Sequence, residues 1–134
     1  MPAFKLSDAV VPQTVTGQRD SMRAVIRSAV EWQDFWRIIR QPYVDVVPAP
    51  QVDFARDMLI VAALGERSGA QEIAIDSVAL SSGRLLVYVQ RLEAAEGCPV
   101  PLMVTAPLAI VRTLRRDEPP LFVEQVDRRD CRNS

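Results

Sequence analysis

The chain has 134 residues, of which 49% are hydrophobic and 25% are charged. This length and composition indicate one globular domain, 1–134, that can bury a core unaided, and they exclude a chain that is disordered throughout. The formal net charge of −1 gives no long-range field for capturing nucleic acid or an anionic membrane. Histidine is absent, which removes the commonest general base and the commonest metal ligand.

No segment has the length of a membrane-spanning helix. The longest apolar run, Met58 to Leu64, is far shorter than the ~18 residues that such a helix needs, so we expect no membrane insertion. Residues 1–4 lack the basic start and the apolar core of a signal peptide. Two hypotheses stay open: an extracytoplasmic protein, periplasmic or secreted, whose signal peptide is not part of this sequence, or a cytoplasmic protein.

Short strands are predicted before the first helix. Residues 1–20 are polar apart from an alternating patch, which indicates a strand near 9–16. Residues 17–20 then form a turn, and Met22 to Arg27 alternate weakly as a second short strand.

The helix is the clearest element of the first half. Ser28 and Glu31 fit a capping box, in which the hydroxyl and the carboxylate each satisfy a free amide of the first turn. The large apolar side chains that follow recur with helical spacing and therefore share one face; they are Trp32, Phe35, Trp36 and Ile39. Pro42 ends the pattern. We expect a helix over about 29–40, packed through its tryptophans on an apolar surface.

A proline-containing extended loop over 41–52 leads to the run Met58 to Leu64. Every position of this run is apolar, which favours a central strand covered on both faces, with the helix on one of them. Gly65 to Gly69 then turns the chain.

A hairpin is predicted next. Apolar residues alternate from Gln71, but their phase slips at Asp76-Ser77, which indicates a β-bulge. The sequence Ser81-Ser82-Gly83 is typical of a hairpin turn, and residues 85–89 return as the partner strand. A loop over 93–101, strands over 108–114 and 121–126, and a charged tail over 127–134 complete the pattern.

Together these elements predict an α+β fold. It consists of an antiparallel β-sheet of six or seven short strands, curved or sandwich-like, with one amphipathic helix packed on one face. Strands do not alternate with helices, so a doubly wound parallel sheet is disfavoured.

Three motifs occur together over about 28–126. They are a Trp-x-x-Phe-Trp helix, an Asp-Phe-x-x-Asp-Met entry to an apolar strand that ends in Gly-Glu-Arg, and a Pro-x-x-Ile-Val-Arg strand. Their residues are Trp32, Phe35, Trp36, Val52, Asp53, Phe54, Asp57, Met58, Gly65, Glu66, Arg67, Pro107, Ile110, Val111 and Arg112. As a set these motifs resemble the PrcB C-terminal domain family, which is named for an accessory subunit of a bacterial surface protease complex.

The resemblance implies a non-catalytic, exported domain that binds or stabilises a partner protein. Because the family is named for a subunit of a protease complex, a protease is the partner that it suggests. The family usually follows Gly-Glu-Arg with a Thr-Gly-Gly-Tyr-like turn, whereas this chain has neither that aromatic residue nor the second glycine. This turn is the candidate partner-binding segment, and a simple hairpin connection is the alternative. Its residues are Glu66, Arg67, Ser68, Gly69, Ala70 and Gln71.

Cys98 and Cys131 are the only cysteines. In an exported domain an even pair favours a disulfide, which here would tie the 127–134 tail back to the body. Closing this loop would stabilise the fold by about 3–4 kcal/mol. Two unrelated free thiols are the alternative. The spacing excludes a CxxC redox motif, and the lack of other soft ligands excludes a zinc site.

Other candidate sites have structural explanations. Trp32 and Trp36 could form a platform for sugars or bases, but their spacing favours packing in the core. Asp53 and Asp57 could serve acid–base chemistry, but Asp53 precedes a strand, where a turn cap is favoured. The C-terminal arginines alternate with acidic residues, which favours a solvated, salt-bridged face over nucleic-acid binding. No catalytic residue, cofactor or metal site is predicted.

The sequence therefore predicts a non-catalytic exported domain that binds a partner protein through the 66–71 turn or an exposed strand edge. The alternative function is small-ligand binding in a pocket between helix and sheet, lined by the tryptophans. An enzyme that relies on carboxylates is the least favoured hypothesis.

Overall fold

The computed structural model describes residues 3–5, 16–42, 47–68, 71–94, 97–98 and 104–129. In these ranges the chain forms one helix, α2 (Ala29–Ile39), and nine strands. The strands are β1 (Ala3–Lys5), β2 (Met22–Ile26), β3 (Asp57–Ala63), β4 (Arg67–Ser68), β5 (Glu72–Ser81), β6 (Arg84–Ala94), β7 (Val104–Thr105), β8 (Leu108–Leu114) and β9 (Pro120–Arg129).

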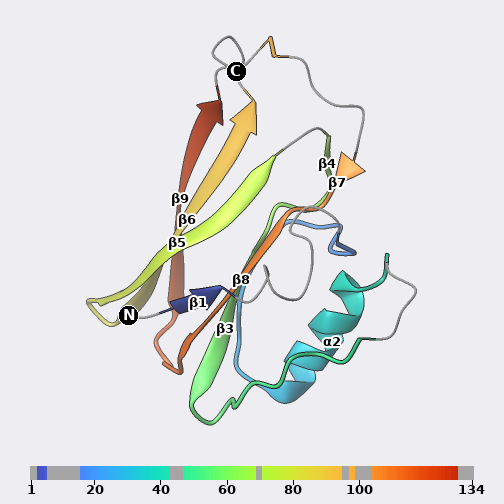
Figure 1. Ribbon diagram of the computed structural model, residues 1–134. Coiled ribbons are helices and arrows are strands. Elements are labelled where there is room, and N and C mark those ends of the chain that lie inside the picture. Colours follow the sequence, from blue (N-terminus) through green and yellow to red (C-terminus); the bar gives the residue numbers. More distant parts are fainter. Residues whose placement is uncertain are drawn as a thin grey trace.

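The described elements form three layers. A four-stranded antiparallel sheet has the order β1-β8-β3-β2, and a three-stranded sheet has the order β5-β6-β9. Helix α2 lies against the four-stranded sheet, and the three-stranded sheet lies on the opposite side of β3 and β8 (Figure 1). Strands β4 and β7 pair with each other as a separate two-stranded sheet. The predicted α+β class is confirmed.

Strand β3 is the centre of the molecule because both of its faces are buried. Met58, Ile60 and Ala62 pack into the core between the two sheets. Leu59, Val61 and Ala63 point the other way, into the core beneath the helix. Since successive side chains of a strand alternate between faces, a strand that divides two cores must be apolar throughout. This explains the unbroken run in the sequence and confirms its prediction as a central strand.

Helix α2 begins as predicted and ends one residue early. The Ser28 hydroxyl accepts the amide of Glu31 at 3.2 Å and donates to the Glu31 carboxylate at 2.9 Å, which caps the first turn. At the other end the amide of Gly17 donates to the carbonyl of Ile39 at 3.2 Å. A Cβ on Gly17 would lie 2.0 Å from the Ile38 carbonyl oxygen. Only glycine therefore fits against this end of the helix.

The β5–β6 hairpin confirms two detailed predictions. The register shifts between Ile75 and Ser77, where the sequence indicates a bulge. The two residues of the turn, Ser82 and Gly83, have φ of 51° and 76°. Positive φ at both positions matches the right-handed twist of the strands that they join.

The expectation of a wholly antiparallel sheet is wrong for one pair. Strand β9 lies parallel to β6 over ten consecutive residue pairs. The cause is that β8 belongs to the four-stranded sheet, so the connection to β9 crosses to the other sheet and cannot form a hairpin. The tail assigned to 127–134 also begins too early, because 127–129 belong to β9. The strand expected near 9–16 lies outside the described residues except for Thr16, which is not in a strand.

Candidate functional site

The 66–71 segment contains a short strand, β4, in addition to the turn that the sequence suggests. Gly65 has φ of 78° and sits so close to the Arg19 carbonyl that a Cβ would lie 2.7 Å from its oxygen. The amide of Glu66 donates to the same carbonyl at 2.9 Å. Arg67 and Ser68 then pair with β7. Backbone contacts thus fix this end of β3, which gives the Gly-Glu-Arg sequence a structural role.

The described side chains of this segment do not converge on one site. Glu66 is exposed and makes a 3.7 Å ion pair with Arg19. The Arg67 guanidinium donates to the Glu66 carbonyl at 2.9 Å. Gln71 is half-buried, and Gly69 and Ala70 lie outside the described residues. Partner binding by the 66–71 turn therefore stays a prediction.

The predicted disulfide also stays a prediction. Cys98 is half-buried in the connection after β6, and no free cysteine occurs in the described part of the chain. Its predicted partner, Cys131, lies outside the described residues.

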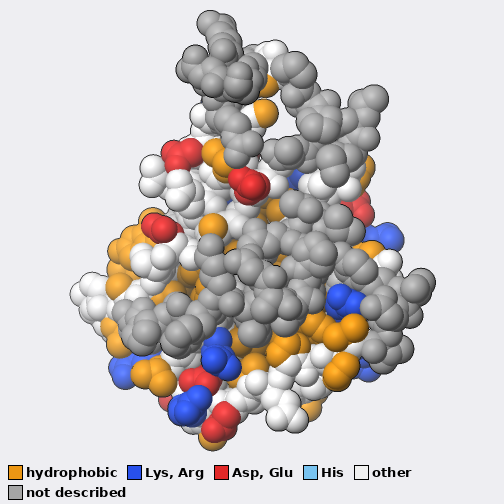
Figure 2. All heavy atoms as spheres, viewed as in Figure 1, with side chains coloured by type: hydrophobic (Ala, Val, Ile, Leu, Met, Phe, Trp, Pro, Cys, Tyr) orange, Lys and Arg blue, Asp and Glu red, His pale blue; other side chains and the backbone are white. Residues whose placement is uncertain are grey.

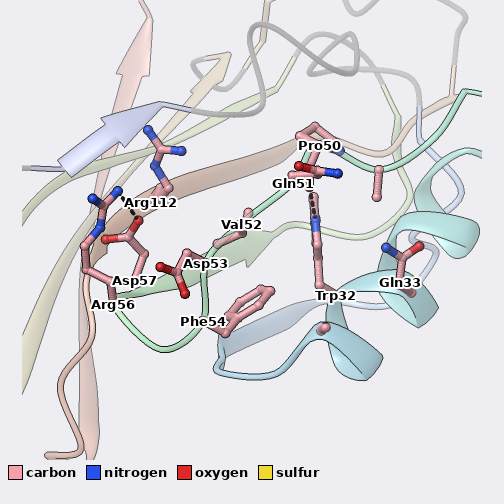
Figure 3. Close-up of a pocket in the computed structure, with 12 residues that line it drawn as sticks. Trp32, Gln33, Pro50, Gln51, Val52, Asp53, Phe54, Arg56, Asp57 and Arg112 are labelled. Atoms are coloured by element: carbon pink, nitrogen blue, oxygen red, sulfur yellow. Dashed lines mark hydrogen bonds and ion pairs between the residues drawn. The ribbon is translucent and has the colours of Figure 1, made fainter.

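An open pocket of about 500 Å³ lies between the first half of α2, the segment 49–57 and β8 (Figure 3). This volume is within the usual range of ligand pockets. Its walls include Trp32, Gln33, Gln51, Val52, Phe54 and Arg56. Several residues of the sequence motifs, far apart along the chain, thus meet around one cavity.

The two tryptophans hold the segment that forms the pocket wall. The indole N–H of Trp32 donates to the Pro50 carbonyl at 2.8 Å, and that of Trp36 donates to the Val47 carbonyl at 2.7 Å. Both rings are buried, with 1% and 4% of their surface exposed. The prediction of core packing is confirmed, and an exposed aromatic platform is excluded. The tryptophans instead fix a loop through partly buried hydrogen bonds. The indole N–H of a buried tryptophan usually has such a partner.

Asp53 caps the turn that leads into β3, as predicted. Its carboxylate accepts the Ala55 amide at 3.1 Å, and its carbonyl accepts the amides of Arg56 and Asp57 at 3.0 and 2.7 Å. An aspartate side chain that bonds the backbone two residues on is a common way to build such a turn. The turn places the side chains of Arg56 and Asp57 at the edge of the pocket.

Arg56 and Asp57 form the charged wall of the pocket. A guanidinium nitrogen of Arg56 lies 3.2 Å from Oδ2 of Asp57, and the exposed fractions of the two side chains are 70% and 8%. The hydrogen bond to Asp57, followed by the charge of that carboxylate, raises the pKa of Arg56. A buried carboxylate thus holds an exposed guanidinium in place (Figure 3).

The pocket lining brings together Asp53 and Asp57, the two carboxylates considered for acid–base chemistry, and they accept from the Ala55 amide and from Arg56 respectively. Among the described residues that line the pocket there is no serine, threonine, cysteine or lysine that could serve as a nucleophile. Among the described residues no cluster of three or more Asp, Glu, His or Cys could hold a metal ion. The same residues include no helix that is long and apolar enough to cross a membrane.

A second surface lies on the three-stranded sheet. Its inner side chains fill the core, while Tyr88, Leu121 and Val123 are each about two-fifths exposed. Figure 2 shows hydrophobic side chains at the surface on the left of the view, over the part of Figure 1 that β5, β6 and β9 occupy. At the margin of this sheet Glu124 pairs with Arg23 of β2 at 2.6 Å, which joins the two sheets.

The comparisons with known proteins give no identity to either surface. Protein-family models, curated proteins and solved structures all yield no match to this chain.

Proposed function

We propose that this chain is a non-catalytic, exported domain that binds and stabilises a partner protein by accepting one of its strands at the edge of β9. The observation that carries the proposal is the edge itself. Strand β9 is ten residues long, and among the described strands it pairs only with β6, without a bulge. A long, regular edge is a template for strand addition.

The direction of the free hydrogen-bonding groups follows from the ladder. The amide of Leu85 donates to the Pro119 carbonyl at 3.0 Å. In a parallel ladder the partners alternate along the strand, so residues 121, 123, 125 and 127 face β6. The backbone groups of Phe122, Glu124 and Val126 consequently face the open edge.

The other edges of the two sheets are less suited to a partner strand. Strand β5 is interrupted by its bulge, β2 has five residues, and β1 has three. Edge strands are commonly blocked by an inward-pointing charge. Glu124 would be such a block, but Arg23 neutralises it, so β9 keeps its capacity to pair.

The resemblance to an accessory subunit of a protease complex makes a protease of the cell envelope the first partner to test. The partner strand would alternate polar and apolar residues, because it would extend a sheet with one buried and one solvated face.

The test removes one donor from the open edge and leaves the ladder to β6 intact. Val126→Pro deletes an outward amide, whereas the control Val126→Ala truncates the side chain and keeps that amide. We expect Val126→Pro to lose a partner that the parent protein and Val126→Ala both recover from the envelope fraction. Recovery by all three proteins alike, or recovery of no partner by the parent across detergents and salts, would contradict the proposal.

The pocket favours a second candidate function, the binding of a small ligand between helix and sheet. Trp32 lines the pocket and Trp36 is one turn further along α2. These are the only tryptophans of the chain, so intrinsic fluorescence reports on this region. A saturable shift with a metabolite supports the function, and the lack of any shift across a broad panel counts against it.

A further inference from the structure

We propose that the pocket between α2 and the four-stranded sheet takes a singly charged carboxylate that stands next to an apolar side chain and an amide. This is the chemistry of a peptide C-terminus or of a small N-acylated amino acid. The inference rests on the second candidate function, because it names the class of ligand for that pocket, and it is independent of strand addition at β9.

The anchored guanidinium is the anion-binding group. Asp57 accepts from one guanidinium nitrogen of Arg56 and is itself buried, so it restrains an arginine that otherwise projects into solvent. A guanidinium has five N–H donors in a fixed fork. The donors that Asp57 does not use remain available to a ligand, and fixing the fork beforehand lowers the entropy cost of binding.

The neighbouring charges select a monoanion. Two guanidinium groups, of Arg56 and Arg112, and two carboxylates, of Asp53 and Asp57, line the pocket, and Asp57 offsets part of the charge of Arg56. The exposed carboxylate of Asp53 lies in the same wall and also acts on Arg56. Because two arginines and two aspartates balance in this lining, a dianion would leave twice the uncompensated charge that a monoanion leaves. A carboxylate therefore fits this wall better than a phosphate dianion.

The rest of the wall suits the atoms that flank such a carboxylate. Val52 and Phe54 are half-buried and apolar, and they lie between the charged wall and the helix (Figure 3). Gln33 and Gln51 are exposed and line the same pocket. Each offers both a donor and an acceptor, which matches the N–H and C=O of an amide. An aliphatic side chain of the ligand would thus contact Val52 and Phe54, and its peptide group would have Gln33 and Gln51 as hydrogen-bond partners.

The experiment uses two pairs of matched ligands. N-acetyl-leucine and acetyl-Ala-Ala-Leu are each compared with the corresponding C-terminal amide, by tryptophan fluorescence and by calorimetry on the full chain. We expect the acids to bind saturably and the amides to bind at least about tenfold more weakly, since one charge-assisted contact is lost. Tighter binding of the tripeptide acid identifies a peptide end as the ligand, and equal binding identifies a small acid.

Variants assign the effect to the guanidinium. Arg56→Ala should weaken binding of the acids about tenfold or more, and Arg56→Lys should restore it only in part, because an ammonium lacks the planar fork. Arg37→Ala, on an exposed position of α2 outside the pocket, is the matched control and should change nothing. The double variant Arg56→Ala with Asp57→Asn repeats the test without leaving a buried charge unpaired.

The outcomes separate this inference from the function on which it rests. Equal binding of acids and amides, or unchanged binding after loss of Arg56, overturns the inference but leaves a small-ligand pocket. If no acid and no amide shifts the fluorescence or gives heat, the inference is overturned, and binding of an unrelated metabolite then decides whether the second candidate function survives.

Discussion

At the scale of single residues, Arg27 and Arg115 join segments that are far apart in the sequence. Arg27 donates to the carbonyls of Arg116 and Glu118 at 3.0 and 3.1 Å. Arg115 donates to the carbonyl of Phe54 at 2.7 Å. The salt bridges expected from the alternation of charges are present, such as Arg116 with Glu118 at 2.9 Å. The contacts to carbonyls were not predictable, because they depend on which loops meet at this end of the sheets.

One of these pairs gives the stability a pH dependence. The hydrogen bond from Arg116 lowers the pKa of Glu118 below its usual 4.5, and burial opposes this shift. The folded state therefore binds the proton less readily than the unfolded chain, so the pair stabilises the fold above about pH 4.5 and is lost as the pH falls through the lower, folded-state pKa.

We accordingly expect the urea midpoint of the parent protein to fall as the pH decreases below 4.5. Glu118→Gln should show a shallower fall, because its side chain cannot be protonated. Arg116→Ala should also make the fall shallower, since it removes the group that lowers the pKa. An unchanged slope in both variants would show that this pair does not contribute.

Gly17 allows a second prediction at this scale. An added methyl group would collide with the backbone at the end of α2. The helix backbone would have to move, because the nearest atom does not belong to a flexible side chain. Gly17→Ala should lower the free energy of unfolding by about 1–3 kcal/mol. The neighbouring, exposed Arg19→Ala is the control and should stay within about 0.5 kcal/mol. Equal urea midpoints for the two variants would refute the close contact.

At the scale of elements, local signals were enough for the helix, β3 and the hairpin. Ser28 and Glu31 fixed the start of α2, and the alternation slip at Asp76-Ser77 located the bulge. These signals work because the interactions that satisfy them lie within a few residues. The direction of β9 has no such signal, because it follows from the sheet to which β8 belongs.

Strand β3 provides the prediction for this scale. Leu59 and Ile60 are both fully buried but face different cores. Leu59→Ala and Ile60→Ala should each cost about 2–5 kcal/mol, the usual range for a truncated core residue. Val30→Ala, 72% exposed on α2, should stay within about 0.5 kcal/mol. A small effect for Leu59→Ala alone, measured by urea unfolding, would mean that the helix does not pack on β3 as described.

At the scale of the whole molecule, the sequence was sufficient for the fold class but not for the site. Apolar run lengths and periodicities indicate which elements exist and which faces they bury. The pocket instead requires Trp32, the 49–57 segment and Arg112 to meet, and no local pattern encodes contacts at that separation. Asp53 was correctly assigned to a turn, yet Arg56, an exposed charge of the same pocket wall, was missed. The available signal was an arginine next to an aspartate at the entry to the apolar run, Arg56-Asp57.

The predicted bridge between Cys98 and Cys131 also concerns the whole molecule. Protein denatured without reductant should show almost no thiol that reacts with a chromogenic disulfide reagent, whereas about two reactive thiols per chain would contradict the bridge. Replacing both cysteines with serine should lower the free energy of unfolding by about 3–4 kcal/mol. The same replacement should remove the effect of reductant on stability, which distinguishes loss of a bridge from loss of packing.

The double burial of β3 has a consequence for how the chain is made. This strand leaves the ribosome or an export channel well before β8, its neighbour in the sheet, because β4 through β7 come between them. Until β8 follows, Met58 to Leu64 is an uncharged, β-prone segment of the kind that aggregates. The charges that flank it, Asp57 and Glu66, are the type of residue that limits such association. A nascent or translocating form of this protein is therefore expected to depend on a chaperone over this interval, even though the finished fold hides the segment completely.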